Sequence, residues 1–580
     1  MKRLEGLNGM AQRFSTIAVI GLGTTGSALA RMVARSGRRV IAVDTDAAAL
    51  EPAGARLTDT GRGTVDLTTR TADIMSADLV IEAVPERMKT KCEVLGQAHR
   101  ACAPGTVFAT TTTGLAVTDI AFGSGRPSRT VGLHLFPQGP VDRETAVEVV
   151  GTPLTDGSVL TDVQALIREL GQVPVPVPDR AGFVGGALTM AYLNDAAMMY
   201  EQRYASRDGI DTAMTLGCGL PRGPLAHLDA IGLDVARDTL DALYERTGDR
   251  RFLPAPVLTH MVTAGLLGLK AGRGFYDYGA PDADGAADPG DALPTARPVR
   301  RIGVVGSGTM ATGIAEACAR AGYPTTLVAR SEVRAKEALA AVESSLNRAV
   351  RRGRLTPEQL TSSMESLTGV SGLEAVAGCD LVVEAVVEDI DVKRTVFREL
   401  DAGCGAQTVL ATSTSSLPVI ECAMATGRPE AVVGMHFFNP APVMKLVEVV
   451  RTALTSRETL GVAHATATAL GKRPVGCLDR SGFIVNALLF PYLNSAVALL
   501  DEGILTAEDI DTVMTLGQGY PMGPLQLLDV IGLDVSVAIL RTLHTTFREP
   551  CLLPSRPLEQ LVEAGHLGRK RGKGLRNHER

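Results

Sequence analysis

Short apolar runs alternate with helical segments in the first part of the chain. The run STIAVI ends at a glycine turn, a helical segment follows, and RRVIAVD, ADLVIEAV, TVFATTT, TVGLHLF and TAVEVV come later. Such runs, separated by helices, are typical of a mainly parallel sheet. From about Gly182 the apolar residues take helical spacing, as in ALTMAYLNDAAMMYEQRY. The pattern predicts an α/β Rossmann-type domain followed by an all-α domain.

The whole pattern occurs twice. The segments 211–235 and 511–535 are identical at 18 of 25 positions, and DRAGFV at Asp179 matches DRSGFI at Asp479. A repeat in fixed order predicts a tandem duplication. A stretch rich in Ala, Asp, Gly and Pro separates the copies and predicts a flexible linker. The expected parts are a flexible N-terminus (1–13), a Rossmann-type domain (14–180), a helical domain (181–278), the linker (279–297), a second Rossmann-type domain (298–480), a second helical domain (481–574) and a frayed tail (575–580).

Composition narrows the functional classes. The 580 residues are 45% hydrophobic, carry a net charge of −6 and include no Trp, which argues against binding to nucleic acid or an anionic membrane surface. No apolar stretch reaches the roughly 18 residues that a membrane helix needs. Nine cysteines without a CxxC pair argue against a disulfide framework and against a metal site. We therefore expect a cytoplasmic protein without a metal.

The first glycine turn predicts a dinucleotide site. Gly21, Gly23 and Gly26 follow an apolar strand and open a helix. Glycine permits the tight turn and the close approach of backbone to a pyrophosphate, and the helix N-terminus attracts the phosphates. Asp44 ends the next strand, 23 residues after Gly21, where a carboxylate can hold the ribose hydroxyls of NAD. A glycine turn in an unrelated α/β fold is the alternative.

The second glycine turn differs at the ribose position. Ala329 stands where Asp44 stands in the first copy. Without that carboxylate a 2′-phosphate can be accommodated, and a guanidinium binds phosphate well. The second copy is therefore predicted to prefer NADP, whereas the first is predicted to bind NAD; a surface arginine beside a tolerant NAD site is the alternative. The expected cofactor residues of the second copy on this side are Gly306, Gly308, Thr309, Met310, Arg330 and Ser331.

A histidine and a glutamate stand on two apolar segments that we expect to form neighbouring strands. These are His436 and Glu448, in HFFNPAPVMKLVEVV. A neutral imidazole can accept a proton from an alcohol near neutral pH, and a carboxylate behind it would orient the ring. Taken alone, two such residues twelve positions apart are poor evidence for a catalytic pair, and a core histidine with its hydrogen bonds satisfied is the commoner explanation.

The sequence motifs of the second half closely resemble those of one family. GSGTM, ATSTSSL, GMHFFNPAPVMKLVEVV, DRSGFIVN and GYPMGPLQLLDVIGLD resemble the L-3-hydroxyacyl-CoA dehydrogenases, which include 3-hydroxybutyryl-CoA dehydrogenases. The resemblance covers nearly the whole chain, once per half. It implies a Rossmann-type domain joined to a helical domain, an acyl-CoA substrate, and reversible oxidation of its (S)-3-hydroxyl group with NAD or NADP.

The resemblance also implies roles for residues of the second copy. His436 matches the family's catalytic base and Glu448 its carboxylate partner, while Ser415 and Asn486 match the groups that bind the substrate oxygen. Glu388 and Lys393 match residues near the cofactor ribose and nicotinamide. We expect this copy to carry the main activity.

The first copy keeps only part of this set. His134 and Glu148 remain, 14 residues apart instead of 12, and Thr113 takes the place of Ser415, but Gly186 replaces Asn486. Losing one donor to a developing charge costs on the order of 10²–10³ in turnover. We expect a weaker catalytic site that still binds NAD. The residues expected at this cofactor site are Gly21, Gly23, Gly26, Asp44, Glu86 and Lys91.

Other interpretations stay open. The chain could be another two-domain Rossmann enzyme, acting on 3-hydroxy acids or sugar nucleotides, and the first copy could be a nicotinamide-binding scaffold without turnover. Relatives of the resembled family pair through their helical domains, so we expect the two helical domains to pack within one chain, with a homodimer as a further alternative. Acyl length, a second carboxylate on the substrate, and the direction of reaction are not predicted.

Overall fold

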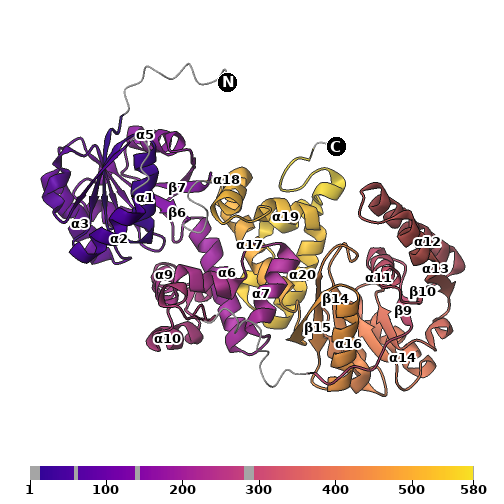
Figure 1. Ribbon diagram of the computed structural model, residues 1–580. Coiled ribbons are helices and arrows are strands. Elements are labelled where there is room, and N and C mark those ends of the chain that lie inside the picture. The colour runs from indigo at the N-terminus through magenta and orange to yellow at the C-terminus, as the bar shows by residue number, and fades with distance from the viewer. Residues whose placement is uncertain (1–12, 58–62, 137–143, 280–292, 579–580) are drawn as a thin grey trace.

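Two α/β domains lie at the ends of the molecule, with the helices of both helical domains between them (Figure 1). The computed structural model describes residues 13–57, 63–136, 144–279 and 293–578. The expected flexible N-terminus, apart from Arg13, and most of the expected linker lie outside these ranges. The order of elements is an α/β domain and then a helical domain, repeated once.

The first sheet has eight strands in the order β3-β2-β1-β4-β5-β6-β7-β8, all parallel except at the β6–β7 pair. The side chains of β4 and β5 are buried along their full length, because helices cover both faces of the sheet. The strands are β1 (Thr16–Ile20), β2 (Arg39–Val43), β3 (Thr64–Thr68), β4 (Leu79–Glu82), β5 (Val107–Thr110), β6 (Thr130–Leu135), β7 (Ala146–Gly151) and β8 (Val173–Pro178).

Alternate residues of β1 serve two separate cores. Ile17 belongs to a core that includes Leu29, whereas Ala18 belongs to a core that includes Leu95. This alternation fixes the register, since a shift by one residue would exchange the two faces. The helices of this domain are α1 (Thr24–Arg35), α2 (Ala47–Arg56), α3 (Met88–Ala101), α4 (Val117–Gly123) and α5 (Gly157–Glu169).

The second α/β domain repeats this sheet with one addition. Its order is β11-β10-β9-β12-β13-β14-β15-β16, and only the β14–β15 pair is antiparallel. A pair of helices, α12 and α13, connects β10 to β11, where the described residues of the first copy form α2 alone. The elements are β9 (Ile302–Val305), α11 (Thr309–Arg320), β10 (Thr325–Ala329), α12 (Glu332–Arg351), α13 (Pro357–Glu365), β11 (Leu367–Ser371), β12 (Leu381–Glu384), α14 (Ile390–Gly403), β13 (Val409–Thr412), α15 (Val419–Ala423), β14 (Val432–Phe437), β15 (Leu446–Arg451), α16 (Arg457–Ala469) and β16 (Arg473–Leu478).

Each helical domain is built around one long, almost fully buried helix, α6 or α17, and these two helices lie against each other. The rings of Tyr192 and Tyr492 are 6.1 Å apart at this contact. The elements are α6 (Gly185–Glu201), α7 (Arg207–Cys218), α8 (Pro224–Ile231), α9 (Leu233–Thr247) and α10 (Pro256–Thr263) in the first copy, and α17 (Val485–Asp501), α18 (Ala507–Thr512), the π-helical turn η8 (Val513–Gly517), α19 (Pro524–Ile531), α20 (Leu533–Phe547) and α21 (Arg556–Glu563) in the second.

Two expected flexible segments are more ordered than the sequence indicated. Residues 293–297, the end of the expected linker, pack against the second α/β domain. Arg297 forms an ion pair with Glu458 there, at 3.5 Å. The expectation of a frayed tail is wrong for residues 575–578. The backbone N–H groups of Leu575 and Arg576 both donate to the buried carboxylate of Asp529, which fixes this end of the chain.

Candidate active site

Both glycine turns form an open cradle at the start of a helix. Gly21 has φ +94°, and a side chain at Gly26 would lie 1.8 Å from the carbonyl oxygen of Gly21, so neither position accepts a larger residue. A Cβ atom at Gly23 would meet nothing within 4 Å, and Gly23 gives α1 no side-chain cap. Free space above an uncapped helix start suits a pyrophosphate.

The second turn keeps this form with a different third residue. Gly306 has φ +134°, and a Cβ at Gly308 would also meet open space. Ala311 occupies the third position and is fully buried in the core of the domain. Thr309 and Met310, which the sequence predicts at the cofactor, lie in the first turn of α11. The cradle therefore fits a dinucleotide in both copies.

The ribose positions differ as the sequence indicated. The Asp44 carboxylate accepts hydrogen bonds from the backbone N–H of Leu22, at 2.8 Å, and of Asp46, at 3.0 Å, so it is anchored on the glycine turn. In the second copy Ala329 is buried and Arg330 is exposed at the end of β10. Ser331, expected at the cofactor, caps α12 by accepting the N–H of Arg334 at 3.3 Å.

A buried lysine–glutamate pair stands beside each cradle. Lys393 is 1% exposed, and its Nζ lies 2.9 and 3.1 Å from the two carboxylate oxygens of Glu384. Thr412 donates to the same carboxylate at 2.7 Å. Lys91 and Glu82 repeat the pair in the first copy, where burial raises the pKa of Glu82 against the opposing effect of Lys91. Glu384 and Glu82, each at the end of an apolar strand, were missed at the sequence level.

Glu388 organises the loop that carries Ser415. One of its oxygens accepts from the hydroxyl of Thr414 at 2.7 Å, and from the N–H and hydroxyl of Ser415 at 2.8 and 3.1 Å. Burial acts to raise the pKa of Glu388, but the charge of Lys393 and these hydrogen bonds lower it overall. Glu86 holds the Thr113 loop of the first copy in the same way, through the N–H of Thr113 at 2.9 Å.

The histidine and the glutamate face each other across an antiparallel strand pair. His436 on β14 is directly opposite Glu448 on β15, and Nδ1 of the imidazole is 2.6 Å from Oε2 of the carboxylate. The other oxygen accepts from the backbone N–H groups of Ile484 and Val485, at 3.0 and 2.9 Å, where α17 begins. Glu448 is fully buried and His436 is 6% exposed. The carboxylate therefore fixes one ring nitrogen and leaves Nε2 for chemistry.

The same arrangement exists in the first copy. His134 on β6 is opposite Glu148 on β7, and Nδ1 of the ring is hydrogen-bonded to the carboxylate. The other oxygen of Glu148 accepts the N–H of Val184 at 2.8 Å. Residues 137–143, in the longer connection between these strands, lie outside the described residues. The dyad alone therefore does not distinguish the two copies.

The copies differ at the expected oxygen-binding groups. Asn486 lies in the first turn of α17 and donates from its side-chain amide to the carbonyl of Ser415 at 3.1 Å. In the first copy a Cβ atom at Gly186 would lie 2.6 Å from the Cγ2 methyl of Thr113. The methyl group thus occupies space that an asparagine would need, and the two replacements are coupled by packing.

The first copy also has an arginine near this loop. Arg246 on α9 donates to the carbonyl of Gly114 at 3.0 Å and lies 3.4 Å from the carboxylate of Asp179. The matching residue of the second copy is Thr546, whose hydroxyl is 3.0 Å from that of Ser481. No spacing in the sequence indicated this contact, because it joins residues 132 positions apart.

Models of one protein family match both halves of the chain. The family model described as the NAD binding domain of 3-hydroxyacyl-CoA dehydrogenase matches residues 16–180 and 301–480. The model of its C-terminal domain matches 182–278 and 482–578. The chain belongs to the 3-hydroxyacyl-CoA dehydrogenase family. It is therefore an oxidoreductase with a tandem pair of NAD(P)-binding domains.

Two curated relatives each match about half of the chain, and one solved structure matches nearly all of it. A 3-hydroxybutyryl-CoA dehydrogenase of Mycobacterium tuberculosis is 44% identical over 279 residues, which cover 48% of this chain and 98% of the relative. The mitochondrial hydroxyacyl-coenzyme A dehydrogenase of Homo sapiens is 40% identical over 284 residues, covering 48% and 90%. The crystal structure of 3-hydroxybutyryl-CoA dehydrogenase from Escherichia coli K12 covers 95% of this chain and 99% of its own, with a TM-score of 0.65 and 24% identity, and shows the same fold.

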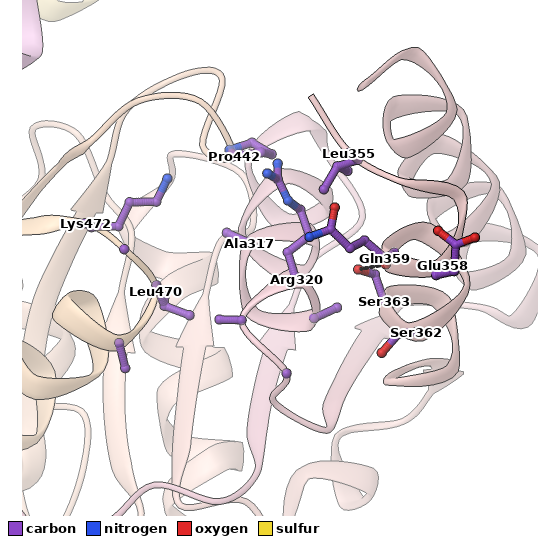
Figure 2. Close-up of a pocket in the computed structure, with 15 residues that line it drawn as sticks. Ala317, Arg320, Leu355, Glu358, Gln359, Ser362, Ser363, Pro442, Leu470 and Lys472 are labelled. Atoms are coloured by element: carbon purple, nitrogen blue, oxygen red, sulfur yellow. Dashed lines mark hydrogen bonds between the residues drawn. The ribbon is translucent and has the colours of Figure 1, made fainter. Parts of the chain in front are cut away.

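A groove of about 560 Å³ lies at the far end of α11 from the glycine turn of this dehydrogenase (Figure 2). Lys472 lines it together with Arg320 and Gln359. The ammonium group of Lys472 donates to the carbonyls of Ala441 and Met444, at 2.6 and 2.7 Å, and burial lowers its pKa to about 8. Lys472 therefore clamps the segment that connects β14 to β15, a role that sequence reasoning missed.

Two further findings concern only the described residues. No helix there is long and apolar enough to cross a membrane. Within the same ranges, no group of three or more His, Cys, Asp and Glu side chains is arranged to hold a metal ion.

Proposed function

We propose that the second copy carries the main 3-hydroxyacyl-CoA dehydrogenase activity of this chain, with 3-hydroxybutyryl-CoA as a substrate. The carrying observation is that His436, Ser415 and the glycine turn lie at the carboxyl ends of strands of one sheet, and that the side-chain amide of Asn486 reaches the Ser415 loop, where the first copy has Gly186 instead. Ligands bind in α/β sheets at the carboxyl ends of the strands. The names of the curated relatives support the substrate class.

The chemistry follows from the hydrogen bonds of the dyad. Bound NAD or NADP supplies the acceptor or donor of hydride at C3 of the acyl chain. Nε2 of His436 accepts the proton of the 3-hydroxyl group during oxidation and returns it during reduction. Glu448 stabilises the imidazolium that forms, and Ser415 and Asn486 orient the substrate oxygen.

For the cofactors, we propose NAD in the first copy and a preference for NADP in the second. Gly21, Gly23 and Gly26 would hold the pyrophosphate in the first copy, and Asp44 the ribose. In the second copy the exposed guanidinium of Arg330 would face the 2′-phosphate, since no carboxylate stands at Ala329. Lys91 and Lys393 would act by holding Glu82 and Glu384 in place, because both ammonium groups are buried.

For the assembly, we propose that the two helical domains hold one chain together as an internal pseudo-dimer. The contact of α6 with α17 and the core cluster shared by both copies support this. Tethering favours such a contact by raising its effective concentration. A homodimer of whole chains would need a second surface.

The proposed function is tested by removing each histidine in turn. His436→Ala should lower kcat with 3-hydroxybutyryl-CoA by about 10²–10⁴, the usual contribution of a general base. His134→Ala is the matched control and should leave most of kcat in place. Both variants are assayed in both directions, with NAD(H) and with NADP(H). Equal losses of kcat would contradict the assignment of the main site to the second copy.

A further inference from the structure

We propose that the first copy supplies a positioning residue, Tyr204, to the active site of the second copy. This inference rests on the proposed role of the His436–Glu448 pair. The connection between α6 and α7 of the first copy (residues 202–206) and the end of α7 pack against β15 and β16 of the second copy. We call this surface the wall behind Glu448, and turnover in the second copy depends on it. The first copy thereby contributes to catalysis even where its own site is slow.

The first copy extends the second sheet at its edge. The backbone N–H of Leu478, at the end of β16, donates to the carbonyl of Tyr204 at 3.2 Å. Ala205 forms an antiparallel bridge with Cys477. The neighbouring strand β15 carries Glu448, whose register partner on β16 is Val475. The segment from the first copy is therefore two strands away from the buried carboxylate.

The end of α7 approaches the carboxylate from a second direction. A Cβ atom at Gly217 would lie 2.9 Å from Cγ2 of Val485 and 3.0 Å from Cδ2 of Leu446, so only glycine allows this contact without displacing a neighbour. The backbone N–H of Val485 is one of the two donors to Glu448. A shift of α7 would thus be transmitted directly to a hydrogen bond of the dyad.

The side chains from the first copy are deeply buried here. Tyr204 is 4% exposed, and burial together with the Cys477 thiol and the Glu448 carboxylate raises its pKa. Burial and the charge of Glu448 also raise the pKa of the Cys218 thiol, to about 12. Both groups are therefore neutral near pH 7 and add no charge beside the carboxylate.

Charged groups stand on the outer side of this wall. The guanidinium of Arg480 lies 5.7 Å from the Tyr204 ring and donates to Gln202 at 2.9 Å. Arg451 and Asp479 act on the Cys477 thiol from the same side. The groups that meet Glu448 itself are the His436 ring and the two N–H groups of α17. Tyr204 is therefore close enough to feel both the Glu448 carboxylate and the Arg480 guanidinium.

The opposite side of the molecule lacks this contact. Ile504 occupies the position equivalent to Tyr204 and is 62% exposed. Pro178 occupies the position equivalent to Leu478 and has no N–H to donate. η8 of the second copy instead meets the first sheet through the carbonyl of Leu516, which accepts from the hydroxyl of Thr145 at 2.9 Å. The extra backbone bond therefore supports the second dyad and not the first.

The wall has a physical consequence for the dyad. A carboxylate that water cannot reach interacts with its partner in a medium of low effective dielectric. It therefore holds the imidazole more firmly, and stabilises the imidazolium more, than a hydrated carboxylate does. Removing the Tyr204 ring would admit water, screen Glu448 and loosen the His436 ring. The hydrogen bonds that hold the Ser415 loop run to Glu388 and Asn486 and not to Tyr204 or Leu478, so binding of cofactor and substrate should be spared.

The test uses the full chain with His134→Ala, so that only the second site is measured. Tyr204→Ala should lower kcat by about tenfold, because small displacements of catalytic groups are costly, with KM values within about twofold. The acid limb of the kcat/KM profile should move to lower pH, since a hydrated carboxylate stabilises the imidazolium less. Tyr204→Phe should keep kcat and the profile, because it fills the same space. Ile504→Ala is the matched control and should change neither.

A second variant guards against a simple loss of folding. Leu478→Pro introduces the residue found at the equivalent position, Pro178, and removes the N–H that donates to Tyr204, while every side chain of the first copy stays. It should reproduce the lower kcat and the shift of the acid limb. Thermal unfolding is recorded for each variant. Unchanged kcat and profile in both variants, or a lower kcat without movement of the profile, would overturn the inference. Loss of activity in His436→Ala would still support the proposed function in that case.

Discussion

The two copies share the histidine–glutamate dyad but differ in the groups around it. In both, the ring faces a buried carboxylate across an antiparallel strand pair, and that carboxylate receives N–H groups from the first turn of a long helix. The second copy places an asparagine beside the Ser415 loop, whereas the first has Gly186 packed against Thr113. The two copies therefore share the buried dyad and differ in the side chains beside the loop that carries Ser415 or Thr113.

A second difference lies between the second and third strands of each α/β domain. The long helix α12 and the shorter α13 stand there in the second copy, and α13 forms one side of the groove that Lys472 lines. Outside residues 58–62, which the structure does not describe, the first copy has only α2 in this connection. Gln172 replaces Lys472 and accepts the N–H of Thr145 at 2.7 Å. Lys472 and the groove that it lines thus adjoin the connection between β14 and β15, which follows His436.

Among the positions at which the copies differ, the largest expected effect comes from exchanging the residues beside the Ser415 loop. Asn486→Gly should lower kcat by about 10²–10³, the usual loss when one donor to a developing charge is removed. The KM for the nicotinamide cofactor should stay within about twofold, since Asn486 does not touch the glycine turn. Steady-state kinetics in a His134→Ala background measure both values. A loss below about threefold would show that Asn486 is not part of the catalytic set.

The reverse exchange tests whether the first copy can be restored. In a His436→Ala background, Gly186→Asn alone should give no gain, because its Cβ would meet the Thr113 methyl at 2.6 Å. Combined with Thr113→Ser, which removes that methyl, it should raise the remaining kcat by about tenfold or more. Equal rates for the single and double variants would rule out the packing link between these positions.

The sequence predicted the repeat, the two-domain order and the strand pair that carries the dyad, because each depends on apolar periodicity or on adjacent segments. It missed Glu384, since a glutamate at the end of an apolar run gives no sign of the lysine that it meets nine positions later. It missed the Lys472 clamp and the contact of Tyr204 with Leu478 for the same reason. Such contacts join distant segments, and only the packed structure brings them together.

A smaller effect should distinguish the two cofactor sites. Arg330→Ala should raise the KM for NADPH about tenfold in the second copy, measured in a His134→Ala background, because a charge-assisted bond to a phosphate contributes roughly 1.5–3 kcal/mol. The KM for NADH should change little. Ala329→Asp is the complementary variant, since it restores the carboxylate of the first copy and should favour NADH. An unchanged KM for NADPH in Arg330→Ala would contradict the NADP preference.

The smallest expected effect concerns the contact between the copies, where Asp195 on α6 corresponds to Ser495 on α17. Burial raises the pKa of Asp195 to about 7, against the opposing charge of Arg251. A folded-state pKa above the unfolded value of 3.8 means that the stability linked to this carboxyl is present below about pH 4 and is lost as pH rises through 7.

The variant Asp195→Ser gives α6 the residue that α17 has, and Arg251 keeps its ion pair with Asp249 at 2.9 Å. Its free energy of unfolding, measured with urea, should exceed that of the parent by an amount that grows from about pH 4 to about pH 7 and then levels off, within a limit of about 1.4 kcal/mol per pKa unit. The exposed Asp238→Ser is the control, and parallel pH curves for parent and Asp195→Ser would show that the carboxyl does not titrate in this contact.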